Sequence, residues 1–130
     1  MNTITGQQPR DTVARLMEAI NQGDVGAALA LYEPDAVFME EPGKPARGAQ
    51  AIQAALEGFI ALKPTLIGET DQTIERGDVA LFYSKWRLTG TAPDGSSVQM
   101  GGTSSDILRR QADGRWLITI DNPWGAAIFR

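Results

Sequence analysis

Two aspartates near the end of the chain have the type and spacing to do chemistry. Asp106 and Asp121 lie in two alternating runs of residues joined by Asp113-Gly114, a dipeptide that favours a tight hairpin turn. A two-residue loop sets the two aspartates directly opposite one another, and a four-residue loop sets them diagonally on the same face. Such a pair is stable in solvent, beside a cation, or with one carboxyl protonated in an apolar cavity.

The composition removes several other kinds of site. The chain has no cysteine and no histidine, which excludes disulfides, thiolate catalysis and the usual zinc sites and leaves acid–base chemistry to carboxylates, tyrosines or lysines. No acidic loop with calcium-binding spacing and no Gly-rich phosphate loop is present. We therefore expect no metal and no cofactor. A formal net charge of -4 without a run of Lys and Arg argues against nucleic acid as a partner.

Length and hydropathy predict a single soluble domain. With 130 residues, 42% of them hydrophobic, the chain suits one globular domain over residues 9–130, preceded by a flexible N-terminus at residues 1–8. No apolar run reaches about 18 residues, and residues 1–10 lack the charged-then-apolar order of a secretory signal. We expect a cytoplasmic protein that does not associate with membranes.

The first half of the chain has helical periodicity. Pro9 opens a helix that ends at residues 21–23, and Asp24 is expected to cap a shorter second helix that extends to Tyr32. A short strand at residues 36–40 and a Pro/Gly-rich loop at residues 42–48 follow. The third helix is expected over residues 49–62 and ends before Pro64.

From residue 66 onward the period changes to two, which is typical of strands. Strands are expected at residues 66–75, 79–88, 98–110 and 115–122, with Gly-containing turns between them. Helices followed by an antiparallel meander indicate an α+β fold. Three N-terminal helices would pack on one face of a curved antiparallel sheet.

This order of elements resembles the nuclear transport factor 2-like superfamily, which includes ketosteroid isomerase, scytalone dehydratase and the SnoaL-like polyketide cyclases. The resemblance covers nearly the whole chain. The local marks are Asn21-Gln22-Gly23-Asp24, Asp35-Ala36, Ala46-Arg47-Gly48, and Asp106 through Gly114-Arg115-Trp116. The chain is most similar to small bacterial SnoaL-like members to which no activity is assigned. The resemblance implies a cone-shaped fold, a homodimer, and a pocket between the helices and the sheet.

The resemblance also implies roles for particular residues. Ketosteroid isomerase uses a proton-shuttling aspartate on its first strand and an oxyanion hole made of a tyrosine and a protonated aspartate. Asp106 falls at the position of the protonated aspartate. For the base, counting back from Pro42 gives Glu41 and counting forward from Asp35 gives Glu40, so both are candidates. Leu16 fills the tyrosine position and can neither donate nor ionise, which argues against steroid isomerisation by the full mechanism.

The two faces of the expected sheet have different roles. With Asp106 pointing inward, the residues expected to line the pocket are Leu16, Phe38, Phe59, Phe82, Trp86, Met100, Ser104, Asp121 and Trp124. The opposite face of the terminal hairpin carries Ile107, Trp116, Ile118 and Ile120, which we expect to be buried in a homodimer. Without the resemblance, this more apolar face would instead pack on the helices and leave both aspartates in water.

Three functions fit these features. A carboxylate-based isomerase, cyclase or dehydratase would use Glu40 or Glu41 to move a proton beside a carbonyl group, while protonated Asp106 donates to the developing enolate. A non-catalytic pocket would bind a small apolar molecule. An association module would use only the apolar outer face. We expect first a pocket protein for a small apolar ligand, and the sequence leaves open whether it is an enzyme.

Overall fold

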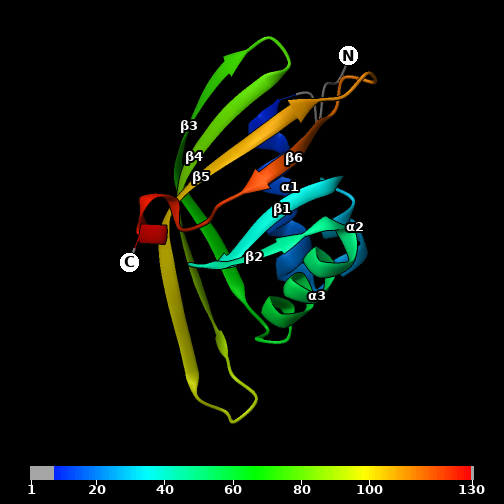
Figure 1. Cartoon of the computed structure of the whole chain (residues 1–130). Helices are drawn as coiled ribbons and strands as arrows, with labels where there is room; N and C mark the ends of the chain where they lie inside the picture. Colours follow the sequence, from blue (N-terminus) through cyan, green and yellow to red (C-terminus); the bar gives the residue numbers. More distant parts are fainter. Residues whose placement is uncertain (1–7, 130) are drawn as a thin grey trace.

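Three helices pack on one face of a curved, six-stranded sheet (Figure 1). The computed structural model describes residues 8–129, so the expected flexible N-terminus lies outside the described residues apart from Gln8. The strand order is β2-β1-β6-β5-β4-β3, and the sheet is not closed. The α+β fold predicted from the sequence is confirmed.

The helices form where the apolar periodicity predicts them. They are α1 (Pro9–Gln22), α2 (Val25–Leu29) and α3 (Gly48–Ile60). Gly23 ends α1 with φ at 74°, a left-handed conformation that glycine adopts without strain. The carboxylate of Asp24 caps α2 by accepting the N–H of Ala27 at 3.0 Å. No helix within residues 8–129 has the length and apolar character needed to cross a membrane.

The strands comprise the predicted meander, the predicted earlier strand, and one short strand that was not expected. They are β1 (Tyr32–Glu41), β2 (Lys44–Arg47), β3 (Thr65–Arg76), β4 (Val79–Thr91), β5 (Ser97–Arg110) and β6 (Trp116–Asp121), and a 3-10 turn, η1 (Gly125–Phe129), follows. The ladders from β3 to β6 are antiparallel, as predicted. β1 pairs with β6 in parallel, so the sheet is mixed rather than wholly antiparallel. β2 occupies part of the segment that was expected to be a loop.

Tyr32 opens β1 rather than ending the second helix. The helix stops at Leu29, and the strand begins well before the predicted start at Ala36. A residue that precedes proline is disfavoured in helix, and Pro34 therefore favours extended backbone at Glu33. As a result, Tyr32 lies on the inner face of the sheet, where it is 5% exposed.

The register between β5 and β6 changes within the hairpin. Beside the turn, Arg110 pairs with Trp116, so the loop is longer than the predicted two residues. A bulge at Thr119 then shifts the register, and Ile107 pairs with Ile120. Beyond this point the strands run in the register that a two-residue loop would have given.

This final register sets the two aspartates opposite one another. On one side of them Ile107 pairs with Ile120, and on the other the N–H of Ser105 donates to the carbonyl of Asn122 at 2.8 Å. Asp106 and Asp121 lie between these two contacts. Both therefore point to the inner face of the sheet.

Because of the same bulge, the expected dimer face is wrong for two of its four residues. Trp116 is 3% exposed and Ile118 is 1% exposed, because both pack inward in the core. Ile107 and Ile120 stay on the outer face, where Ile120 is 38% exposed. Strict alternation along a strand does not hold across a bulge, and for that reason the four residues do not share one face.

Glu33 ties the bulge to its neighbours. Its carboxylate accepts hydrogen bonds from the Thr119 hydroxyl, from Arg109 Nε at 3.1 Å and from Gln111 Nε2 at 3.0 Å. Burial acts to raise the pKa of Glu33, but these hydrogen bonds outweigh it and lower the pKa below its usual value. Glu33 therefore stays ionised and links β1, β5 and β6.

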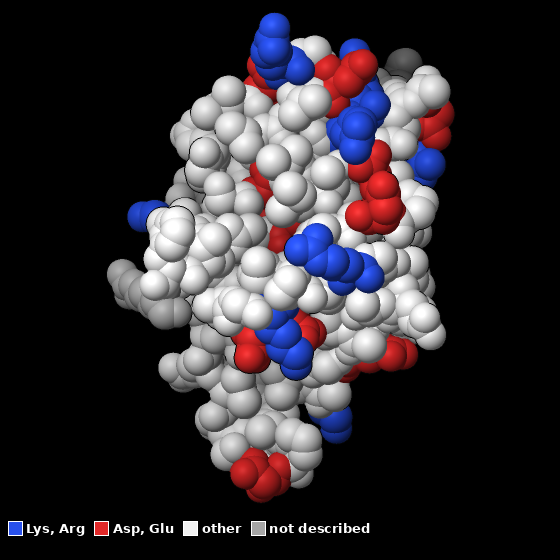
Figure 2. All heavy atoms as spheres, viewed as in Figure 1, with Lys and Arg blue, Asp and Glu red and all other residues white. Residues whose placement is uncertain are grey.

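Charged side chains of both signs are intermixed on the face shown in Figure 2, with broad uncharged areas between them. Several exposed charges are paired. Arg110 lies 2.8 Å from Asp78, Arg87 lies 3.2 Å from Glu69, and both pairs are more than a third exposed. Exposed pairs of this kind stabilise a fold by only about 0 to 1 kcal/mol each. The stability of the fold therefore rests mainly on the core between helices and sheet.

Candidate functional site

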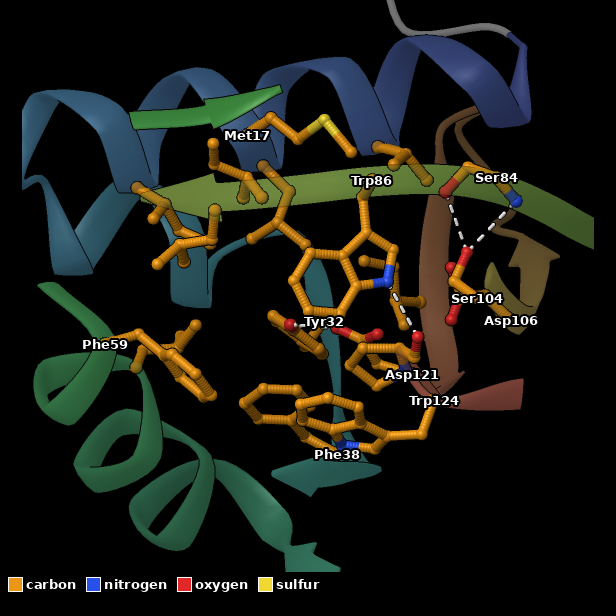
Figure 3. A pocket seen from close by; sticks show the side chains of 18 residues that line it. Met17, Tyr32, Phe38, Phe59, Ser84, Trp86, Ser104, Asp106, Asp121 and Trp124 are labelled. Atoms are coloured by element: carbon orange, nitrogen blue, oxygen red, sulfur yellow. Dashed lines mark hydrogen bonds between the residues drawn. The ribbon is translucent and has the colours of Figure 1, made fainter. Parts of the chain in front are cut away.

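A cavity lies between the helices and the inner face of the sheet (Figure 3). The volume open to the centres of water molecules is about 80 Å³. One water needs about 10 to 15 Å³ on this measure, so the cavity has room for roughly five to eight waters. Its walls are largely apolar and include Leu16, Met17, Phe38, Phe59, Trp86 and Trp124. Its polar groups belong to Tyr32, Ser84, Ser104, Asp106 and Asp121.

All of the predicted lining residues border this cavity except Phe82 and Met100. Phe82 is 2% exposed and borders a second hollow, between α1 and β3. Met100 pairs with Leu88 and is half-buried, and the ribbon formed by β4 and β5 extends past the helices (Figure 1). Both side chains lie on the predicted face of the sheet, but Phe82 packs in the core beside α1 and Met100 does not border the cavity.

Asp106 and Asp121 form a carboxyl pair at the cavity wall. They are 5% and 7% exposed. Asp106 Oδ1 accepts the backbone N–H of Asn122 at 2.8 Å, and the two carboxyl groups hydrogen-bond one another. The Tyr32 hydroxyl donates to Asp121 Oδ2 at 2.5 Å. The site is therefore a cluster of three titratable groups within an apolar enclosure.

Burial decides how this cluster is protonated. It raises the pKa of Asp106 well above its usual value, and the neighbouring charge of Asp121 raises it further. Burial also raises the pKa of Asp121, although hydrogen bonds from Tyr32 and Asp106 act in the opposite direction. The pKa of Tyr32 is raised by burial and then by the charge of Asp121, so the phenol stays neutral. We conclude that Asp106 holds the proton that the two carboxyl groups share and donates it in a hydrogen bond to Asp121.

The charge of the pair has no basic counterpart nearby. Within residues 8–129, no Lys or Arg forms an ion pair with either carboxyl group. In that same range, no group of three acidic side chains comes together as a metal-binding cluster. The negative charge is instead stabilised by hydroxyl groups and by the shared proton.

Neither glutamate expected as a base borders the cavity. The carboxylate of Glu40 lies 3.0 Å from the ammonium group of Lys44, and Glu41 is exposed. Both lie at the end of β1, where the register with β2 shifts. The structure brings Asp106 together with Asp121 and Tyr32 rather than with either glutamate.

Tyr32 is the polar group that the sequence analysis missed. It was expected on a helix, and only the Glu33-Pro34 step pointed to an earlier start of the strand. The aromatic residue at this place supplies a hydroxyl to the carboxyl pair from β1, the strand that lies beside β6 in the sheet.

Two tryptophans close one side of the cavity. Trp86 Nε1 donates to the carbonyl of Pro123 at 2.7 Å, and Trp124 Nε1 donates to the carbonyl of Met39 at 2.9 Å. Their rings meet edge to face, with centroids 5.5 Å apart. These contacts hold the segment after β6 across the cavity wall and limit the access of water.

The arrangement suits proton transfer on a small molecule. A protonated carboxyl group can donate a proton, and the ionised carboxylate beside it can accept one. Both act more strongly where water is excluded, because the effective dielectric is low. A bound molecule would contact both groups from the cavity side.

Comparison with known proteins gives a family and a fold. Residues 13–118 match the family model described as SnoaL-like domain. No curated protein matches the sequence. Among solved structures, a nuclear transport factor 2-like superfamily protein from Salmonella enterica serovar Typhimurium aligns with a TM-score of 0.80 at 19% identity, covering 91% of this chain and 88% of that one.

Two further structures align over most of their length. A candidate ketosteroid isomerase from Shewanella frigidimarina has a TM-score of 0.73 at 22% identity and covers 85% of this chain and 89% of its own. A protein from Catenulispora acidiphila, solved in complex with S-DNPA, has a TM-score of 0.72 at 26% identity and covers 86% of each chain. The likenesses to the Salmonella protein and to the Shewanella protein concern the fold alone.

Proposed function

The chain belongs to the SnoaL-like domain family of the nuclear transport factor 2-like superfamily, and we propose that it binds a small, largely apolar molecule and exchanges a proton with it. One observation carries the proposal: the carboxyl groups of Asp106 and Asp121, which are 5% and 7% exposed, lie side by side in an otherwise apolar cavity. Burying carboxyl groups costs folding free energy, so a pair retained in such a place favours a functional role.

The size of the cavity limits the ligand. Room for roughly five to eight waters corresponds to about 150 to 240 Å³ of liquid, which suits a molecule with one ring. A steroid, with four fused rings, is too large for the cavity at this volume. The aromatic walls, including Phe38, Phe59 and Trp86, favour a flat hydrocarbon body.

The proposed chemistry is acid–base catalysis on a carbonyl compound. Asp121 would take a proton from a carbon next to the carbonyl group, and Asp106 would donate to the oxygen as negative charge develops there. Asp121 replaces Glu40 and Glu41 as the proposed base because it borders the cavity and they do not. Isomerisation, cyclisation and dehydration all use these two steps. Binding without turnover is the simpler form of the same proposal.

We expect small monocyclic ketones, lactones or aromatic acids to raise the melting temperature of the wild type. A ligand at a hundred times its Kd adds about 2.7 kcal/mol to the free energy of unfolding. In Asp106→Asn this ligand effect should be lost or strongly reduced, because the amide cannot give up a proton. A thermal-shift screen on both proteins measures it, with Asp35→Asn, an exposed aspartate on β1, as the matched control.

The screen tests whether the carboxyl pair takes part in ligand binding. Stabilisation that Asp35→Asn retains and Asp106→Asn loses supports the proposed site, and a stabilising compound can then be tested for exchange of its hydrogens with deuterated water. Equal effects in all three proteins, or no stabilising compound at all, would remove the role of the carboxyl pair in binding.

The outer face of the sheet supports self-association. One row of apolar side chains crosses five neighbouring strands, and its members are Ile74, Leu81, Ile107, Ile120 and Val37. Ile74 is 59% exposed and Ile120 is 38% exposed. We propose that a second copy of the chain covers this row, since an exposed apolar face can pair with itself about a two-fold axis.

Ile120→Lys is expected to convert a dimer into a monomer. The substitution places a charge in the middle of the apolar row, where a dimer would bury it. Light scattering at micromolar concentration should give twice the chain mass for the wild type and the single chain mass for the variant. Ile67→Lys is the control, because Ile67 is 48% exposed, somewhat more than Ile120, and lies away from the row. A monomeric wild type would contradict the proposal.

A further inference from the structure

The carboxyl pair lies beside further polar side chains on the cavity wall, among them the hydrogen-bonded pair Ser84 and Ser104 (Figure 3). Ser84 Oγ and Ser104 Oγ lie 2.8 Å apart, and either can donate to the other. Ser104 donates in turn to Asp106, and Asp106 is bonded to Asp121. The Tyr32 hydroxyl completes the chain at 2.5 Å from Asp121. Five polar side chains from β4, β5, β6 and β1 thus follow one another along the cavity wall.

A second hollow lies on the other side of Ser84. It separates α1 from β3 and offers about 470 Å³ to the centres of water molecules, which is room for roughly thirty to fifty waters. Its lining includes Arg10, Glu18, Asn21 and Asp71. This cleft between α1 and β3 is therefore polar and wide enough to be hydrated.

Two contacts keep the cleft open at a fixed width. Arg10 forms an ion pair with Asp71 near the start of α1. At the other end of the helix, the Asn21 amide donates to the carbonyl of Leu66 at 2.9 Å and accepts its N–H at 2.6 Å. Because α1 is tied to β3 at both ends, the cleft is a constant feature of the fold.

Ser84 borders both the cavity and the cleft. Val13 and Met17 do so as well, but they are apolar and cannot conduct protons. Ser84 is 5% exposed and Ser104 is 4% exposed, so neither hydroxyl is an ordinary surface group. The serine pair is the polar connection between water in the cleft and the carboxyl groups in the cavity.

We propose that Ser84 and Ser104 are a proton relay between the cleft and the Asp106–Asp121 pair. This inference rests on the proposed function and adds the route by which the pair regains or loses its proton. When the pair is fully ionised, hydronium in the cleft gives a proton to Ser84 Oγ, Ser84 passes its own proton to Ser104 Oγ, and Ser104 passes its own to the carboxylate. At each hydroxyl one O–H bond forms and one breaks, so both serines end neutral. The reverse sequence releases a proton to water.

A side route is needed because the cavity itself is closed to water when it is occupied. A bound molecule fills the space beside the pair, and Trp124 holds the C-terminal segment across the wall. A pair that has given its proton to the ligand would then have no water to replace it. The serine relay supplies the proton from the cleft between α1 and β3.

The test follows the buried carboxyl proton by infrared spectroscopy after mixing with deuterated water, in protein saturated with toluene, a one-ring hydrocarbon chosen to occupy the cavity and without a carbonyl band of its own. Exchange of hydrogen for deuterium shifts the carbonyl band of a protonated carboxyl group, and Asp106→Asn assigns the band. Ser84→Val and Ser84→Thr have the same shape and differ only in one hydroxyl group. Exchange in Ser84→Val should slow by about a hundredfold, as expected when a positioned proton carrier is lost. Ser84→Thr and the outer-face control Ser105→Ala should keep the wild-type rate.

The same pair of substitutions at Ser104 gives a second measurement, which covers the case in which Ser84→Val does not fold. Equal exchange rates in the Val and Thr variants would overturn the relay and would leave the ligand screen unaffected. Absence of the protonated band in the wild type would overturn both the relay and the proposed proton chemistry, because there would be no buried proton to move.

Discussion

Asp106→Asn is expected to make the protein more stable at about pH 8 and to flatten the dependence of its stability on pH. Burial raises the pKa of the Asp106 carboxyl group, so its ionised form is disfavoured in the folded protein. Asparagine has the same shape and no charge. Its Oδ1 can still accept the N–H of Asn122, and its amide can donate to Asp121 as the protonated carboxyl does.

The sign follows from proton binding. An unfolded aspartate loses its proton near pH 3.9, whereas folded Asp106 keeps its proton to a higher pH. Between these two values the folded protein binds more protons than the unfolded chain. The free energy of unfolding therefore falls by up to about 1.4 kcal/mol for each pH unit as the pH rises. The stabilising contribution of protonated Asp106 to the free energy of unfolding is complete below about pH 3.9 and is lost as the pH rises through the raised pKa.

Urea denaturation from about pH 5 to about pH 9 measures this effect, with Asp35→Asn as the control that should keep the wild-type slope. Glu33 acts in the opposite direction, because its pKa is lowered and its contribution is lost as the pH falls. That loss falls below about pH 4.3, the usual range for glutamate, and so lies outside the measured window. Parallel curves for the wild type and Asp106→Asn would contradict the buried, protonated state.

A stabilising substitution at Asp106 would itself be informative. Natural chains keep destabilising groups mainly where activity needs them. Replacing the carboxyl group of Asp106 by an amide would remove the loss of folding free energy that its ionisation causes, yet the chain has an aspartate there. The expected gain in stability and the expected loss of ligand effects in the same variant are two results of one arrangement.

The sequence predicts the long, regular elements well because their periodicity is unbroken. The β4–β5 ladder runs without a register shift from Val79 to Thr91, and its alternation correctly sets Trp86, Ser104 and Asp106 on one face. The same alternation includes Phe82 and Met100, which do not border the cavity. Periodicity indicates which face a residue takes, but the extent of the cavity depends on where the helices cover the sheet.

The sequence left the turn open between two and four residues and did not predict the bulge, although it set both aspartates on one face. The turn is longer than Asp113-Gly114 suggests, and the bulge at Thr119 restores the register beyond it. The bulge is held by Glu33, which lies far away in the sequence, and no local pattern around Thr119 announces that contact. Long-range hydrogen bonds therefore decided a register that the hairpin sequence alone could not settle.

Ile118→Ala should lower the free energy of unfolding far more than Ile120→Ala, although the two residues are only two positions apart. Ile118 is 1% exposed and packs in the core, so its truncation should lower the free energy of unfolding by about 2 to 5 kcal/mol at any protein concentration. Ile120 is 38% exposed on the outer face, and its truncation should cost within about 0.5 kcal/mol in a monomer.

If the outer face pairs with a second copy, the effect of Ile120→Ala should grow with protein concentration, because dimer formation is linked to folding by mass action. Urea denaturation at two concentrations separates these cases. In a regular strand the two isoleucines would share one face and lose similar amounts of stability. Equal losses would therefore contradict the bulge at Thr119, and with it the register that brings Asp121 to Asp106 inside the cavity. The losses in free energy of unfolding on truncating these two isoleucines thus test the geometry on which the acid–base site depends.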